Sequence, residues 1–141
     1  MSTKKVHLRI ITPEEIKVDE KTDMVIMRCT TGDMGILPGR EACSVILDLG
    51  VLRILDGSSE RKIAIFGGIA EMQKDVLTIL TNDAEWPEDI DRARAEADRE
   101  EAERRLESAV EDMEIQSHQV LLRRSLVRIE VSSYPLISKT E

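Results

Sequence analysis

Aromatic side chains are nearly absent from this chain of 141 residues. The three that occur are Phe66, Trp86 and Tyr134. Since hydrophobic residues still make up 41% of the chain, it can bury a core, and that core must be aliphatic. The length allows one ordinary domain, or a small domain with an appendage.

Cysteine and histidine are also scarce, with two of each. Cys29 and Cys43 show no spacing typical of a metal or redox site, and His7 and His118 lie far apart in the sequence. We therefore expect no zinc site. Both cysteines lie among apolar residues, so we expect them to be reduced and buried.

Positive charge and long apolar runs are lacking as well. The chain carries 20 Lys and Arg against 28 Asp and Glu, a net charge of −8, which argues against a nucleic-acid partner because phosphates attract clustered basic residues. No apolar run approaches the roughly 18 residues of a membrane span. The first residues, 1–6, lack the apolar core of a signal peptide. We therefore expect a cytoplasmic location.

Glycine is missing from the second half, since all seven glycines fall at or before Gly68. The first half reads as about eight or nine short strands with alternating or continuous apolar residues, separated by turns at Asp56-Gly57 and Gln73-Lys74-Asp75. The predicted strands are 6–10, 16–18, 24–29, 44–49, 51–55, 61–66, 68–72 and 76–80. This pattern predicts a β-sandwich or flattened barrel over residues 1–85.

The second half, residues 86–141, predicts two helices. Pro87 suits a first helical turn, and no breaker follows until about residue 107, so the first helix is expected over 87–107. Ser108-Ala109-Val110-Glu111 matches a capping box, which places the start of a second helix there, running to about residue 131. The result is an antiparallel helical hairpin with a tight turn.

The apolar stripes of this hairpin are thin. Those of the first and second helix are Ala95, Ala102 and Leu106, and Ile115, Leu122, Leu126 and Ile129. Because burial stabilises in proportion to apolar area, this hairpin should dock and undock at modest cost. The alternative is a fixed, solvated appendage.

Glycine and proline are concentrated in one stretch, residues 31–40 (Thr-Gly-Asp-Met-Gly-Ile-Leu-Pro-Gly-Arg). Glycine allows positive φ and proline fixes φ, so the stretch is interpreted as a bulged corner between two strands. A second pair, Gly67-Gly68, precedes Ile69. It matches no dinucleotide fingerprint, and we expect it to let a strand bend or approach a neighbour.

No arrangement of a nucleophile and a base stands out, and nothing matches a phosphate-binding P-loop. His118 lies among polar residues of the predicted second helix and is interpreted as a surface histidine. The sequence therefore predicts no catalytic site and no metal site.

The helices offer one possible binding site. Asp91 and Arg94 share a face of the first helix, and Arg124 and Arg128 share a face of the second. An antiparallel hairpin would bring these residues together, and guanidinium groups suit phosphate. The alternative is an ordinary network of surface ion pairs.

Three segments together resemble the epsilon subunit of the rotary F-type ATP synthase, in order and over nearly the whole chain. The first is the glycine-rich stretch 31–40, in which Arg40 stands where the family usually has histidine. The second is Gly-Gly-Ile-Ala-Glu at 67–71. The third is Ile-Asp-Arg-Ala-Arg-Ala at 90–95, which fits the family's nucleotide motif at every specified position.

This resemblance implies a non-catalytic subunit of the central stalk. The sandwich would bind the gamma subunit and the membrane rotor ring, coupling proton flow to ATP synthesis. The helices would inhibit ATP hydrolysis by reaching the catalytic head of alpha and beta subunits. The subunit would be peripheral, on the cytoplasmic side of the membrane. The loop in contact with the rotor would contain Asp33, Gly35, Pro38, Gly39 and Arg40.

The resemblance also implies that the hairpin could bind ATP as a weak regulatory ligand, with no cofactor required. The matching positions are Glu85, Asp91, Arg94, Arg124 and Arg128. Two positions that are basic in family binders are Glu101 and Ser117 here, which points to weak binding. A free-standing adaptor or chaperone with a client-gripping hairpin is the alternative function.

Overall fold

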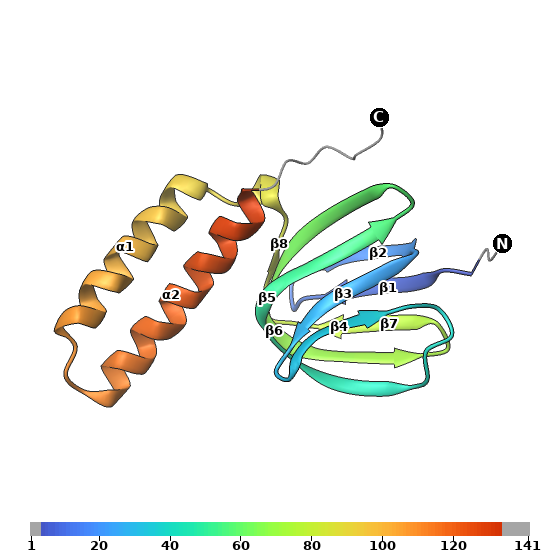
Figure 1. Ribbon diagram of the computed structural model, residues 1–141, viewed down its shortest axis with the longest axis horizontal. Helices are drawn as coiled ribbons and strands as arrows, with labels where there is room; N and C mark the ends of the chain where they lie inside the picture. The colour runs from blue at the N-terminus through green and yellow to red at the C-terminus, as the bar shows by residue number, and fades with distance from the viewer. Residues whose placement is uncertain (1–3, 134–141) are drawn as a thin grey trace.

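The computed structural model describes residues 4–133, in which a β-sandwich is joined to a helical hairpin (Figure 1). The expected class, a sandwich followed by two antiparallel helices, is confirmed. The C-terminal tail that the sequence places after the second helix, including Tyr134, lies outside the described residues, as do the first three residues.

Eight strands of the described part form one hydrogen-bonded sheet that folds over into two layers (Figure 1). Their order is β2-β1-β7-β6-β5-β3-β4, and β8 pairs with β6. β1 and β7 run parallel, with His7 opposite Val76, and the other pairings are antiparallel. The strands are β1 (Val6–Ile11), β2 (Ile16–Thr22), β3 (Met24–Cys29), β4 (Gly32–Ile36), β5 (Cys43–Asp56), β6 (Ser59–Gln73), β7 (Val76–Leu80) and β8 (Ala84–Glu85).

Alternation along the strands builds the core between the layers. In β1, Val6, Leu8 and Ile10 are fully buried, while His7 and Arg9 are half-buried on the other face. The buried members of the main cluster are aliphatic, methionine or cysteine side chains, as the shortage of aromatics predicts.

Two long strands replace four of the predicted short ones. Segments 44–49 and 51–55 are both parts of β5, and 61–66 and 68–72 are both parts of β6. Glycines bend these strands without ending them. At Gly67 and Gly68, φ is +84° and +133°, and the ladder skips a pair between Leu47↔Gly68 and Leu49↔Phe66. As expected, the glycine pair lets β6 bend beside its neighbour.

The glycine-rich stretch is only partly the predicted corner. Residues Gly32–Ile36 form strand β4, which pairs with β3 in a hairpin, so the prediction of a corner is wrong for this half. Gly35 lies opposite Ile26 and does not have positive φ. The corner follows β4, where Gly39 has a φ of +88° and its amide donates to Asp75 Oδ1 at 2.7 Å.

The helices begin later than the sequence suggested. Pro87 opens a single 3₁₀ turn, η1 (Pro87–Asp89), and α1 (Arg92–Ser108) starts after Asp91, whose side chain accepts from the Arg94 amide at 3.1 Å.

The predicted capping box is also wrong. Ser108 is the last residue of α1 and its hydroxyl donates to the Arg105 carbonyl at 3.3 Å, while α2 (Asp112–Ser132) begins after Glu111.

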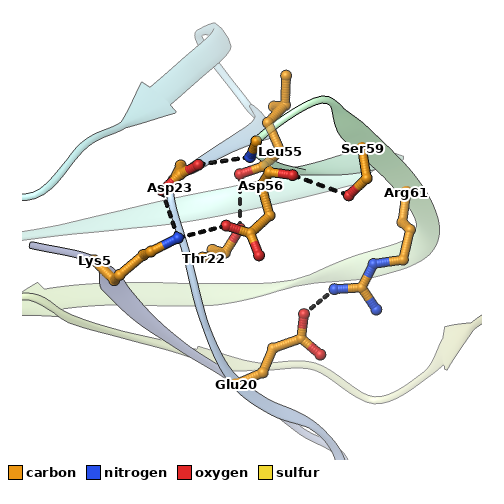
Figure 2. Close-up of polar contacts among 9 residues, drawn as sticks. Lys5, Glu20, Thr22, Asp23, Leu55, Asp56, Ser59 and Arg61 are labelled. Atoms are coloured by element: carbon orange, nitrogen blue, oxygen red, sulfur yellow. Dashed lines mark hydrogen bonds and ion pairs between the residues drawn. The ribbon is translucent and has the colours of Figure 1, made fainter. Parts of the chain in front are cut away.

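A polar cluster fastens one end of the sandwich, where β1 begins (Figure 2). Lys5 Nζ lies 2.8 Å from Asp23 Oδ1 and 2.7 Å from Asp56 Oδ1, and the other Asp23 oxygen accepts from the Gly57 amide at 2.6 Å. Hydrogen bonds to Asp23 and Asp56 raise the pKa of Lys5, and Lys5 lowers the pKa of Asp23. One ammonium therefore ties β1 to the β2–β3 turn and the β5–β6 hairpin.

Candidate functional site

The candidate site is the interface at which α2 docks on the sandwich. We call α1 and α2 together the arm. α2 lies between α1 and the sandwich (Figure 1). Val127 and Val131 pack on Ala64 and Phe66 of β6 in a small apolar cluster, with Leu49, Val51 and Ile90 half-buried around it. The sequence did not single out either valine, and Leu126 of its predicted stripe is 45% exposed.

Three arginines of α2 each meet a carboxylate of the sandwich. Arg123 Nη2 lies 2.6 Å from Asp48 Oδ1, and Arg124 Nη2 lies 3.6 Å from Asp83 Oδ2. Arg128 binds Glu85 through two hydrogen bonds, from Nε to Oε1 at 2.8 Å and from Nη2 to Oε2 at 3.1 Å. Bidentate arginine–carboxylate pairs are among the strongest polar contacts, so the Arg128 pair leads the interface.

Phe66 links the apolar and charged parts of the interface. The guanidinium carbons of Arg124 and Arg128 lie 4.4 and 4.9 Å from its ring centroid. Cations over an aromatic face are attracted by its electron density, and the attraction grows when water is excluded. One aromatic ring thus orients both arginines toward their carboxylates.

The carboxylates respond to this environment in opposite ways. Burial works to raise the pKa of Glu85, but the hydrogen bonds and charge of Arg128 outweigh it and hold this pKa below its ordinary value. Burial and the neighbouring Glu85 carboxyl raise the pKa of Asp83, with Arg124 opposing them. Burial also acts on Asp48, yet Arg123 lowers its pKa overall.

Four of the five residues predicted to bind nucleotide line one cavity of about 250 Å³ at the start of α1. They are Glu85, Asp91, Arg94 and Arg128. The Arg94 side chain is exposed and none of the described residues forms an ion pair with it, whereas Arg128 is already engaged by Glu85. The cavity can offer one uncommitted guanidinium to an anion.

Arg124, the fifth, lies instead on the wall of a second cavity, of about 400 Å³, between α1 and α2. Glu101 and His118 share this wall. Glu101 pairs with Arg105, with an oxygen–nitrogen distance of 2.5 Å, so it places negative charge where a phosphate would need a cation. Ser117 is exposed.

His118 differs from the predicted surface histidine. The ring is half-buried, and its Nδ1 is buried without a hydrogen-bond partner in the described part of the chain. The sequence lacked a signal for this burial because the residues around His118 in α2 are mostly polar.

The residues of the predicted rotor-contact loop lie together at the β4–β5 connection. Asp33, Gly39 and Arg40 are exposed, and Gly35 and Pro38 are half-buried. Asp33 accepts from Arg28 Nε at 2.6 Å. The neighbouring Leu37 is 53% exposed, so the loop presents both charge and apolar surface.

Other expectations from composition can be compared with residues 4–133. Cys29 is buried and Cys43 half-buried, and both are free. Burial raises the pKa of the Cys29 thiol. Within these residues we find no group of His, Cys, Asp and Glu placed to hold a metal ion, and no helix long and apolar enough to cross a membrane.

A sandwich carrying a docked pair of helices defines the chain as a two-domain subunit of ATP synthase. The family model "ATP synthase, Delta/Epsilon chain, beta-sandwich domain" matches residues 5–87, and "ATP synthase, Delta/Epsilon chain, long alpha-helix domain" matches residues 88–133. The chain belongs to the ATP synthase delta/epsilon chain family, which confirms the resemblance drawn from the sequence.

Individual relatives are epsilon chains. The chain is 36% identical to the ATP synthase epsilon chain of Caldicellulosiruptor saccharolyticus, over 88% of this chain and 90% of that one. It is 37% identical to that of Bacillus subtilis, over 92% and 98%. A chain of the Euglena gracilis mitochondrial ATP synthase is similar with a TM-score of 0.81 over 92% of this chain and 82% of that one. At 23% identity, that likeness is one of fold.

Proposed function

We propose that the chain is the epsilon subunit in the central stalk of a proton-translocating F-type ATP synthase, where it performs no catalysis of its own. The sandwich binds the gamma subunit and, through the loop containing Asp33 and Arg40, the membrane rotor ring. It thereby couples proton flow to ATP synthesis. The subunit is peripheral, on the cytoplasmic side of the membrane.

The observation that carries this proposal is the unequal construction of the two parts. The sandwich has a continuous aliphatic core, whereas the arm docks through four buried residues and three ion pairs. A small interface of this kind opens more easily than the core around it. It supports a regulatory arm that leaves the sandwich without unfolding it.

A released arm would be chemically suited to inhibit. Undocking frees Arg123, Arg124 and Arg128 from their carboxylates and exposes Val127 and Val131 on the same helix. Such a helix can bind an acidic, partly apolar surface of the catalytic head of alpha and beta subunits. Binding there would block the rotation that accompanies ATP hydrolysis.

ATP is proposed as a weak ligand of the docked arm, at Glu85, Asp91, Arg94, Arg124 and Arg128. Arg94 and the cavity beside it support the proposal. The Arg128–Glu85 pair must be shared or broken to admit phosphate, and Glu101 adds negative charge nearby. Both features favour weak binding.

The test uses the assembled ATPase carrying either the full chain or the chain ended after Trp86. Removing the arm should raise ATP hydrolysis while leaving the subunit bound to gamma. Hydrolysis that is unchanged under every nucleotide condition would contradict the regulatory role. If the full, tagged chain purifies without ATPase subunits, the adaptor function would be favoured instead.

A further inference from the structure

Gly50 points to an arrangement that its backbone conformation does not explain, because its φ is not positive. A Cβ at Gly50 would lie 2.7 Å from Cβ and 2.8 Å from Cγ of Arg28. The arginine stem therefore crosses β5 where a side chain would otherwise stand. Arg28 and Asp48 line the same small hollow at this crossing.

Arg28 serves carboxylates on two sides. Asp33 is its direct partner across the β3–β4 hairpin, with Arg28 Nε 2.6 Å from Asp33 Oδ1. Asp48 of β5 and Glu130 of α2 add to the negative field that raises the pKa of Arg28. Loop and arm thus both act on one guanidinium.

The arm contacts this crossing with charges of alternating sign. Arg123 lies 2.6 Å from Asp48, and Glu130 follows seven residues later, two turns along the same side of α2. Arg123 therefore meets the acidic member of the Arg28–Asp48 pair, and Glu130 lies in the field of the basic one.

We infer that Arg28 is a counter-ion shared between Asp33 of the loop and Glu130 of the arm, so that a cationic partner bound at Asp33 tightens the docking of the arm. When Asp33 is engaged elsewhere, the guanidinium is left to Asp48 and Glu130. The proposed function supplies only the identity of the partner, the rotor ring. The coupling itself is a property of the isolated chain.

The effect is expected to be small, because Arg28 and Asp33 are about half exposed and exposed ion pairs contribute little. We expect Asp33→Asn to reduce the population of the open arm about two- to fivefold. Glu130→Gln, which removes the arm's share of Arg28, should increase it by a similar factor.

The experiment measures amide hydrogen exchange of residues 123–131 in the full isolated chain, with amides of β6 as the reference for global stability. Asp19→Asn is the matched control, since Asp19 also pairs across a hairpin, with Arg9 and His7, and its loss changes the net charge equally. We expect slower α2 exchange in Asp33→Asn, no change in Asp19→Asn, and no effect of Asp33→Asn in an Arg28→Gln background.

Three outcomes would overturn the inference. They are an unchanged α2 exchange in Asp33→Asn, an equal change in Asp19→Asn, and an effect of Asp33→Asn that persists without Arg28. None of them bears on whether the chain assembles with an ATPase or controls hydrolysis. Conversely, a failure to assemble would leave the coupling in the isolated chain intact.

Discussion

Arg128 grips Glu85 with two of its nitrogens, across 43 residues of sequence, and each side chain is only about a quarter exposed. This pair joins the middle of the last turns of α2 to the last strand of the sandwich. It is therefore the contact whose loss should be felt first when the arm opens.

Replacing Glu85 with Gln should loosen the arm without unfolding the sandwich. The amide keeps the shape but loses the charge that holds Arg128, a loss of about 1–2 kcal/mol for a partly buried, charge-assisted pair. Amide exchange in α2 should then quicken by roughly an order of magnitude.

Glu60→Gln is the control for this variant, because Glu60 pairs with Arg53 at 2.7 Å within the β5–β6 hairpin. It should leave α2 exchange unchanged. Equal α2 exchange in wild type and Glu85→Gln would show that the fork does not hold the arm.

A chain ended after Trp86 should still unfold cooperatively. The buried members of the main core all precede this residue, and Trp86 packs against them. Truncation uncovers Ala64 and Phe66, so some loss of stability is expected. Urea unfolding followed by circular dichroism is the measurement, and a broad, non-cooperative transition would refute the independence of the sandwich.

Gly68→Ala should be far more destabilising than Gly35→Ala. Gly68 has a φ of +133°, and a Cβ there would lie 2.2 Å from the Leu80 carbonyl oxygen, so both strain and a backbone clash oppose the substitution. At Gly35 the obstacle is the flexible end of Met24, 2.7 Å away. We expect more than about 2 kcal/mol for Gly68 and under about 1.5 kcal/mol for Gly35.

Thermal and urea unfolding of the two variants would check this order. It corrects the expectation that Gly35 itself needs positive φ. A Gly68→Ala variant as stable as Gly35→Ala would show that β6 can move away from β7.

Stability at acid pH should depend on Glu60. Hydrogen bonding by Arg53 and Lys62 lowers the pKa of Glu60 from 4.5 to about 2, against the effect of burial. A carboxyl with a lowered pKa in the folded state stabilises it fully above the unfolded value and loses that contribution as pH falls through the folded value. The relevant window is therefore from about pH 4.5 down to about pH 2.

The measurement is the difference in unfolding free energy between wild type and Glu60→Gln, from urea titrations between pH 6 and pH 3. The difference should be constant above about pH 5 and shrink below it. A difference that does not change with pH would mean that Glu60 titrates normally.

ATP should bind the isolated chain weakly, in the high micromolar to millimolar range at best. Each charge-assisted hydrogen bond contributes only about 1.5–3 kcal/mol, and the Arg128–Glu85 pair competes for one of the few available guanidiniums. Arg94→Ala should abolish the response, and Arg53→Ala in the sandwich should not. Calorimetry at millimolar ATP would decide, and an unsaturable wild-type response would exclude the site.

Local patterns in the sequence sufficed where neighbours in the chain determine the structure. The alternation of Val6, Leu8 and Ile10 predicted a strand with one buried face, and it is one. Glycine misled in both directions, since β4 was interpreted as a corner and Gly50 as a break in β5. In both cases a neighbouring side chain occupies the space above the glycine, and sequence order does not reveal that side chain.

The site was predictable only in part for the same reason. Antiparallel helices bring Arg94 and Arg128 to one cavity, which follows from helix direction alone. Asp48 and Asp83 were missed, because they meet Arg123 and Arg124 only after the sandwich has formed. Phe66, valued first as part of the core, is the ring on which the arginines of α2 rest.

The parallel pairing of β1 with β7 sets an order of events during synthesis. β1 is among the first segments to leave the ribosome, yet His7 must wait for Val76 before that ladder can close. Contacts between distant segments form slowly, whereas the arm is built from neighbours and can form quickly. The helices therefore mature early but find Asp83 and Glu85 in place only once the strands before them have closed. A nascent chain paused before residue 76 would hold an open-edged sheet, and that is the stage most exposed to misassembly.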